Sequence, residues 1–318
     1  MKKTITVSEK KFLILDFDGT FYKTPVPQEL EDAIDLSMFK LFTDKLKVKK
    51  NANEVLKKLD KEFEEFDRSE FTHEELIYFS DKTKPFSVYL EESKDDKDKL
   101  MITRALVKMI KPNGIGNHRV SSMLNLDLDI SQSDIEDYYR KYATIDYKNI
   151  ERNSLVEEVI YNAKRNGYLM FIYTDNSKEN VMSGMKTLGY DSNDFELIID
   201  MFDCNGGTTK KMDEGIDAFK KIMESYCEKN NIEYNLSNFM FYDDNLRICD
   251  SMASNGIQSF HVLPTEIKQV KTQHVKKVVT NMTLATQPLG PISLEPISLF
   301  TFSISLIIIL LFHLIGLF

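Results

Sequence analysis

The chain has 318 residues, of which 42% are hydrophobic, 50 are Asp or Glu and 41 are Lys or Arg. This length and apolar content allow one large or two ordinary domains with a buried core. Both signs of charge are spread along most of the chain, and the balance is acidic. Nucleic acid is therefore not expected as a partner, because binding to a phosphate backbone relies on clustered positive charge.

The cysteines and the first residues bear on the compartment. Cys204, Cys227 and Cys249 are odd in number and widely spaced, with no pair at metal-ligand spacing. This favours a reducing compartment, so the main domain is predicted to be cytoplasmic. The opening stretch MKKTITVSEKK has no apolar run of signal-peptide length, and no secretion is expected.

The first predicted element is a buried strand, FLIL at 12–15, which runs directly into acidic residues. Residues 26–148 are then expected to form a helical cap, since apolar residues recur there at three- and four-residue spacing. The stretch EESKDDKDK at 91–99 is predicted to be a solvated loop or a helix start. The expected helices are 28–47, 53–66, 72–80, 98–110 and 131–142.

Residues 151–263 alternate between helical stripes and short apolar strands. This alternation is typical of a parallel sheet with helices on both faces, and the strand 12–15 is assigned to the same sheet. The fold class predicted is α/β, with a Rossmann-like core made of 11–25 and 149–265. The helical cap is then an insertion over the carboxyl ends of the strands, where such sheets place their ligands. The later strands are YLMFIY (168–173), ELII (196–199), FMFY (239–242) and QSFHVL (258–263).

The C-terminal part differs from the rest. Residues 266–296 contain several prolines near their end and are predicted to be a linker. Residues 297–318 carry no Asp, Glu, Lys or Arg. As a helix they would be about 33 Å long, enough to cross a bilayer core of about 30 Å. Two interpretations stay open, a membrane anchor that leaves the main domain in the cytosol and a disordered tail.

Polar residues gather at the carboxyl ends of three predicted strands. Asp16 and Asp18 follow the first strand, Thr174, Asp175 and Asn176 follow the second, and Asp243 and Asp244 follow FMFY. Lys210 and Lys211 stand between the last two groups, just before a helix. One strand that ends in acids is weak evidence, because acids often begin turns. Three such strands in one sheet predict a site.

Phosphoryl transfer through a covalent intermediate is the chemistry that uses this set. A carboxylate, here Asp16, attacks phosphorus to form an acyl phosphate. Asp18 is predicted to protonate the leaving oxygen and later to take a proton from water. Mg²⁺ suits an all-oxygen site, for which the predicted ligands are Asp16, Asp18, Asp243 and Asp244. The Thr174 hydroxyl and one of Lys210 and Lys211 are expected to bind or neutralise the phosphoryl group.

These motifs resemble those of the haloacid dehalogenase superfamily. Asp16, Asp18 and Thr20 match its Asp-x-Asp-x-Thr motif, and FIYT matches the strand that ends in Thr or Ser. Lys211, or else Lys210, fits the lysine motif, and FMFYDDN fits the acidic motif. The resemblance implies substrate contacts for Thr20, Asp175 and Asn176. It also implies a phosphate-ester hydrolase, because members that act on phosphate keep an acid where Asp18 stands and dehalogenases lack it.

Within the superfamily the chain looks most like the pyrimidine 5'-nucleotidase branch, with a nucleoside 5'-monophosphate as one implied substrate. It departs from that branch at Met212, Asn245 and Ile248, where proline, serine and asparagine are usual. The function predicted is a Mg²⁺-dependent phosphomonoesterase for a small phosphorylated metabolite. The alternatives are a phosphotransferase or protein phosphatase of the same superfamily, and a non-catalytic, membrane-tethered binding protein.

Overall fold

The computed structural model describes residues 10–23, 28–110, 118–204 and 214–270. All of them belong to one compact unit, which extends to Gln273. Lys210, Lys211, most of the predicted linker and the predicted anchor at 297–318 lie outside the described residues. Among the residues described, no helix combines the length and apolar character that crossing a membrane requires.

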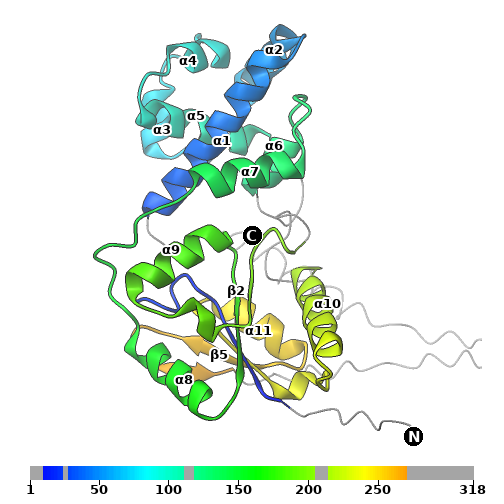
Figure 1. Ribbon diagram of the computed structural model, residues 1–318. Helices are drawn as coiled ribbons and strands as arrows, with labels where there is room; N and C mark the ends of the chain where they lie inside the picture. Colours follow the sequence, from blue (N-terminus) through cyan, green and yellow to red (C-terminus); the bar gives the residue numbers. More distant parts are fainter. Residues whose placement is uncertain (1–9, 24–27, 111–117, 205–213, 271–318) are drawn as a thin grey trace, which may run out of the picture. The chain divides into compact units, whose positions relative to one another are not determined.

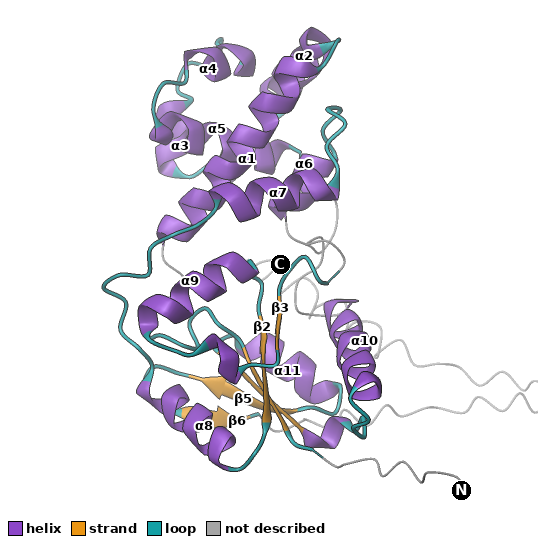
Figure 2. Ribbon diagram, in the orientation of Figure 1, coloured by secondary structure: helices purple, strands orange, loops and turns teal. Residues whose placement is uncertain are grey.

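A six-stranded sheet forms the centre of the core, in the order β3-β2-β1-β4-β5-β6. Figure 2 shows strands of this sheet among the core helices. The first five strands pair in parallel, and β6 pairs with β5 antiparallel. This confirms the predicted α/β class with its parallel sheet. The strands are β1 (Phe12–Leu15), β2 (Leu169–Tyr173), β3 (Leu197–Ile199), β4 (Phe239–Asp243), β5 (Gln258–Val262) and β6 (Ile267–Gln269).

The last strand corrects one predicted boundary. Residues 267–269 were expected to belong to a linker that starts at 266, yet they extend the sheet as β6. This strand has one half-buried and two exposed residues, so it carries no apolar run that could reveal a strand. The sheet core therefore continues to Gln269, four residues beyond its predicted end at 265.

The helices of the core cover both faces of the sheet, because successive side chains of a strand point to opposite faces. Leu13 and Leu15 pack with α8 (Ser154–Arg165) and α9 (Lys178–Leu188). Phe12 and Ile14 pack on the other side with α10 (Glu214–Lys229) and α11 (Leu246–Ser254). All four residues of β1 are fully buried, as expected for a central parallel strand.

Of the eight described α-helices between β1 and β2, the first seven pack around a shared core, and these seven are here called the cap (Figure 1). Phe63 is central to it, with the rings of Phe79 and Phe86 at centroid distances of 5.2 and 5.6 Å. That the cap folds as a separate domain over 26–148 stays a prediction. The helices are α1 (Gln28–Val48), α2 (Ala52–Glu65), α3 (His73–Tyr78), α4 (Phe86–Glu92), α5 (Asp96–Met109), α6 (His118–Leu124) and α7 (Gln132–Tyr142).

Two of these helices, α4 and α6, were not predicted. Each has seven residues, which is too short for an apolar stripe to repeat over several turns. The acidic stretch 91–99 contains the end of α4 and the start of α5, whose N-cap Asp95 accepts a hydrogen bond from the Asp98 amide. Of its two predicted forms, the helix start is thus the better description.

Candidate active site

The parallel register brings the predicted acids to one edge of the sheet. Leu15, the last residue of β1, is the partner of Ile172 in β2 and of Tyr242 in β4. Asp16 continues this pairing, since its amide donates to the Tyr242 carbonyl at 2.8 Å. As a result, one carboxylate oxygen each of Asp16, Asp243 and Asp244 lies within 4.8 Å of the others. We call these three residues the acidic triad.

The acidic triad depends on a glycine in the loop after β1. Gly19 has φ +70°, a conformation that residues with a Cβ rarely adopt. A Cβ at this position would lie 2.2 Å from Oδ2 and 2.5 Å from Cγ of Asp244. Glycine therefore allows the Asp244 carboxylate to lie directly against the loop after β1.

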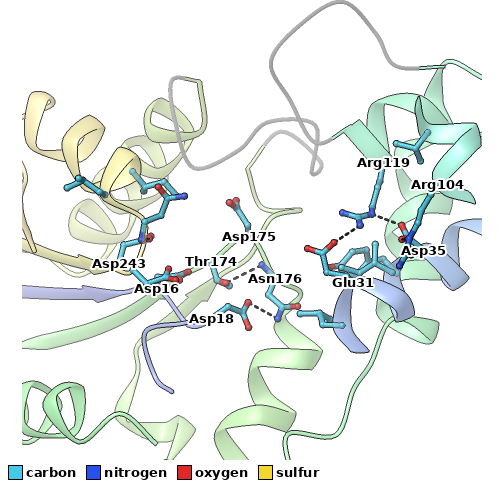
Figure 3. A pocket seen from close by; sticks show the side chains of 18 of the residues that line it. Asp16, Asp18, Glu31, Asp35, Arg104, Arg119, Thr174, Asp175, Asn176 and Asp243 are labelled. Atoms are coloured by element: carbon cyan, nitrogen blue, oxygen red, sulfur yellow. Dashed lines mark hydrogen bonds and ion pairs between the residues drawn. The ribbon is translucent and has the colours of Figure 1, made fainter. Parts of the chain in front are cut away.

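Asp18 is held apart from the acidic triad. Its Oδ1 accepts a hydrogen bond from the Tyr22 hydroxyl at 2.6 Å. Its Oδ2 accepts one from Asn176 Nδ2 at 2.9 Å, as Figure 3 shows. The Asn176 amide also contacts the buried hydroxyl of Tyr147 at 3.1 Å. The Asp18 side chain is thus positioned as a separate acid, and its predicted role as a carboxylate ligand of the metal does not match the group of three.

Thr174 and Asn176 form a small turn after β2. Thr174 is 1% exposed, and its hydroxyl oxygen accepts a hydrogen bond from the Asn176 amide at 3.1 Å. Both residues and Asp175 line the same cavity as Asp16 and Asp18. Asn176 uses its side chain mainly within the protein, since its Oδ1 also accepts from the Ser177 amide at 2.8 Å. The structure therefore gives Asn176 a positioning role beside its predicted substrate contact.

Thr20 does not reach the cavity. It is fully buried, is not among the residues that line the cavity, and its Oγ1 has no hydrogen-bond partner. The structure thus does not bring Thr20 to the cavity wall, and its predicted substrate contact stays a prediction. The two candidate lysines, Lys210 and Lys211, cannot be placed in the site because they lie outside the described residues.

The site opens into a cavity of about 770 Å³ with two different walls (Figure 3). The core wall contains Asp16, Asp18, Thr174 and the other strand-end residues. The sequence analysis did not predict the cap wall. One signal for part of it was present, because Glu31 and Asp35 lie four residues apart on one predicted helix and so share a face. Its charged and aromatic members are Glu31, Asp35, Arg104, Lys108, Arg119 and Tyr139.

Burial changes the acid–base chemistry of the phenols near the site. Burial, followed by the charge of Asp18, raises the pKa of Tyr22 far above its usual range. The pKa of Tyr139 is raised by the same two causes. Both phenols stay protonated at neutral pH, so Tyr22 is a hydrogen-bond donor to Asp18. Cys204 is buried nearby, and burial raises its pKa to about 12.

The cap is joined to the core beside the site. Arg140 in α7 donates to Glu179 at 2.6 Å and to the buried carboxylate of Asp200 at 2.8 Å. Its guanidinium also lies 5.1 Å from the ring centroid of Phe202. The preceding residue, Tyr139, lines the cavity and packs edge-on against the same ring. We call the contacts of Arg140 with Glu179, Asp200 and Phe202 the joint. The joint and part of the cavity wall are therefore formed by neighbouring residues of α7.

Comparison with known proteins supports the family. A family model described as haloacid dehalogenase-like hydrolase matches residues 108–220, which include β2 and Thr174 but neither β1 nor β4. No curated protein sequence matches the chain.

Several solved structures align with most of the chain at low sequence identity. A haloacid dehalogenase-like family hydrolase from Xanthomonas campestris aligns at 11% identity and a TM-score of 0.34, over 81% of this chain and 85% of that one. A predicted phosphoglycolate phosphatase from Haemophilus somnus aligns at 14% and 0.34, over 80% and 85%. An L-2-haloacid dehalogenase from Xanthobacter autotrophicus aligns at 9% and 0.34, over 80% and 77%.

The matched family and the residues at the sheet edge agree. The motif acids of the resemblance, Asp16 and Asp243, come together outside the matched segment, and Thr174 stands beside them within it. The chain is therefore similar to the haloacid dehalogenase-like hydrolases over the segment that the family model matches.

Proposed function

We propose that the protein is a Mg²⁺-dependent phosphomonoesterase that acts on a small phosphorylated metabolite through an aspartyl-phosphate intermediate. The observation that carries this proposal is the arrangement of Asp16 and Asp18 in one cavity. Asp16 belongs to the acidic triad, whereas Asp18 is fixed by Tyr22 and Asn176. Two carboxylates in different surroundings suit different chemical roles.

The acidic triad fits a small hard cation. It offers only carboxylate oxygens, which are the ligands that Mg²⁺ prefers, and a triad of this size leaves coordination positions for water and phosphate oxygens. Asp16, Asp243 and Asp244 are the residues that would hold the ion. Bound there, Mg²⁺ would neutralise charge on the phosphoryl oxygens as they approach the carboxylates.

The residues of the chain supply the proposed chemical steps. A carboxylate oxygen of Asp16 attacks phosphorus, and the bond from phosphorus to the ester oxygen breaks. Asp18 gives its proton to that oxygen, so the leaving group departs as an alcohol. Asp18 then accepts a proton from a water molecule that attacks the aspartyl phosphate. Inorganic phosphate is released, and the Asp16 carboxylate and protonated Asp18 are restored.

A phosphate ester is favoured over a carbon–halogen bond by Asp18. Cleavage of an ester needs a proton for the leaving oxygen, whereas a departing halide needs none. Asp18 lines the cavity, and both of its oxygens have donors that orient it. Thr174 supports the same reading, because its hydroxyl lines the cavity and can donate to a phosphoryl oxygen.

A small substrate is favoured by the cavity. Its volume of about 770 Å³ lies within the range of roughly 300–1,000 Å³ that is typical of small-molecule sites. Residues of the cap form one of its walls, which argues against a protein substrate. A nucleoside 5'-monophosphate remains one predicted substrate among others.

The test is phosphate release by the full-length protein, with Mg²⁺ and with EDTA, on p-nitrophenyl phosphate and a panel of nucleotide and sugar phosphates. Asp16→Asn is expected to abolish turnover. Asp250→Asn is a matched control, because Asp250 is exposed on α11, and it should behave like the wild type. A folded protein that releases no phosphate from any of these compounds would leave the phosphomonoesterase proposal without support and favour a binding role.

A further inference from the structure

The cap wall of the cavity carries four connected charged residues, Glu31, Asp35, Arg104 and Arg119, here called the cap cluster (Figure 3). Asp35 is its centre. Its side chain is 1% exposed and accepts hydrogen bonds from Arg104 Nε at 3.1 Å and Arg119 Nε at 2.6 Å. Both oxygens of Asp35 are thereby engaged by arginines from α5 and α6.

Each arginine of the cap cluster has a second carboxylate partner. Arg119 donates through Nη2 to Glu31 at 2.7 Å, and Arg104 donates through Nη2 to Asp32 at 2.7 Å. Burial lowers the pKa of Arg119, but Asp35 and Glu31 outweigh it, and the net pKa is raised. Arg119 is therefore charged, and both guanidinium groups are already paired with acids of α1.

The whole cavity wall has an excess of acids. Among the described residues that line it, seven are Asp or Glu, whereas only Arg104, Lys108 and Arg119 are basic. Lys108 is paired as well, with the buried carboxylate of Glu75. Five of the seven acids lie on the core wall, and the cap wall has Glu31 and Asp35 beside the three bases. The partners Asp32 and Glu75 raise the cap acids to four, so a carboxylate or second phosphate on a substrate would meet no unneutralised cation among these residues.

Glu31 is the accessible acid of the cap cluster. Its side chain is 47% exposed, compared with 1% for Asp35, and Arg119 holds it in place. A carboxylate accepts hydrogen bonds only, so it selects hydroxyl or N–H groups. The apolar side chains of Leu30, Ile34 and Val107 line the same wall and can pack against a sugar or base.

On the basis of the proposed phosphatase function, we infer that the substrate's leaving group carries no negative charge and is bound through its hydroxyl or N–H groups by Glu31. The leaving-group class is a sugar, a polyol or a nucleoside. Substrates with a second anionic group, such as phosphoglycolate or sugar bisphosphates, are disfavoured. Asp35, Arg104 and Arg119 act as positioning residues for Glu31 and for the cap wall.

The experiment compares kcat/KM of the full-length protein with Mg²⁺ on matched pairs of substrates at fixed ionic strength. Ribose 5-phosphate and uridine 5'-monophosphate have uncharged leaving groups, whereas 2-phosphoglycolate and fructose 1,6-bisphosphate carry a second anion. We expect at least one uncharged leaving group to exceed both anionic ones by about tenfold or more, mainly through KM. A preference for 2-phosphoglycolate or the bisphosphate would overturn the inference and leave the phosphatase function intact.

The variant Glu31→Gln tests the residue itself. It keeps the size of the side chain, removes its charge and releases one partner of Arg119. The ratio of kcat/KM for 2-phosphoglycolate to that for ribose 5-phosphate should rise by about tenfold. Glu74→Gln is the control, because Glu74 lies on α3 and pairs with exposed Lys97 rather than lining the cavity. An equal ratio in the two variants would show that Glu31 does not select the leaving group.

Failure of the function itself has a separate signature. If p-nitrophenyl phosphate and every panel member fail to release phosphate with Mg²⁺ while the protein is folded, the phosphatase proposal falls, and the inference about the leaving group falls with it. Turnover of p-nitrophenyl phosphate together with an anionic preference contradicts the inference alone.

Discussion

Asn176 donates its side-chain amide to Oδ2 of Asp18 at 2.9 Å and so links the turn after β2 to the loop after β1. The Tyr22 hydroxyl donates to the other oxygen at 2.6 Å. Two donors thus orient Asp18, and one of them, Asn176, lies 158 residues away from it in the chain. An acid that must deliver a proton to one atom gains from such fixed orientation.

Tyr22→Phe removes one of these donors without changing the ring. We expect kcat to fall by about tenfold, with a shift of its pH profile, and KM to stay within about twofold, because the proton donor is misplaced while substrate contacts remain. Tyr190→Phe is the control, since the Tyr190 hydroxyl donates to the backbone of Phe21 at 3.3 Å and does not line the cavity. Equal losses in the two variants would mean that Tyr22 acts only through stability.

Gly19→Ala should strain the backbone at a positive φ and displace one carboxylate of the acidic triad. The added Cβ must displace the Asp244 carboxylate, so the Mg²⁺ concentration for half-maximal activity should rise at least about tenfold. Gly167→Ala is a matched control, because Gly167 has the same φ of +70° and no atom within 4 Å of the added Cβ. Both variants should lose about 1 kcal/mol of stability from the positive φ, and unchanged Mg²⁺ dependence in Gly19→Ala would contradict the crowding.

Arg140→Gln tests the joint between cap and core. It removes the ion pairs with Asp200 and Glu179, and Tyr139 beside it lines the cavity, so KM should rise about fivefold. Asp200 keeps backbone donors, among them the amides of Lys178 and Phe202, which limits the loss of stability to about 1–3 kcal/mol.

Arg68→Gln provides the comparison for Arg140. Arg68 also lies over a phenylalanine, with its guanidinium 4.7 Å from the ring centroid of Phe63, and Phe63 belongs to the core of the cap. Urea unfolding and steady-state kinetics on both variants separate the two effects. A rise in KM for Arg68→Gln of the same size would show that any loosening of the cap, rather than the joint, controls binding.

Asp134 predicts a pH dependence of stability. Burial raises the pKa of Asp134, but the ion pair with Lys45 and the hydrogen bonds from Ser131, the N-cap residue of α7, outweigh burial and lower this pKa to about 2. Because the folded pKa lies below the unfolded value of about 4, the stabilisation is complete at neutral pH and is lost as the pH falls from about 4 to about 2. Solvent screening limits its size to about 1 kcal/mol.

Asp134→Asn should therefore destabilise the protein at pH 7 by about 1 kcal/mol and by clearly less at pH 3. Urea unfolding at the two pH values measures this difference. Asp96→Asn, which removes an exposed pair with Lys99 at 2.8 Å, should change stability by only a few tenths of a kcal/mol. A cost for Asp134→Asn that is the same at both pH values would rule out ionisation as its source.

The sequence predicted the core of the molecule well where the apolar pattern was long or repeated. Strands such as β1 and β4 are continuous apolar runs, and α8, α9 and α10 carry regular stripes, so their positions follow from burial alone. The short helix α4 and the polar strand β6 have no such pattern. They exist because of neighbours in the fold, namely the cap core and the edge of β5.

By itself, the sequence determined that acids follow three strands, and parallel pairing is enough to bring Asp16, Thr174 and Asp243 to one edge. Only the tertiary structure decided which way each side chain points. It buried Thr20, engaged Asn176 with Asp18, and placed Glu31 and Arg119 opposite the acids. The physical reason is that the position of a strand in the chain follows from its own run of buried apolar residues, whereas a cavity wall depends on packing between segments far apart in the chain.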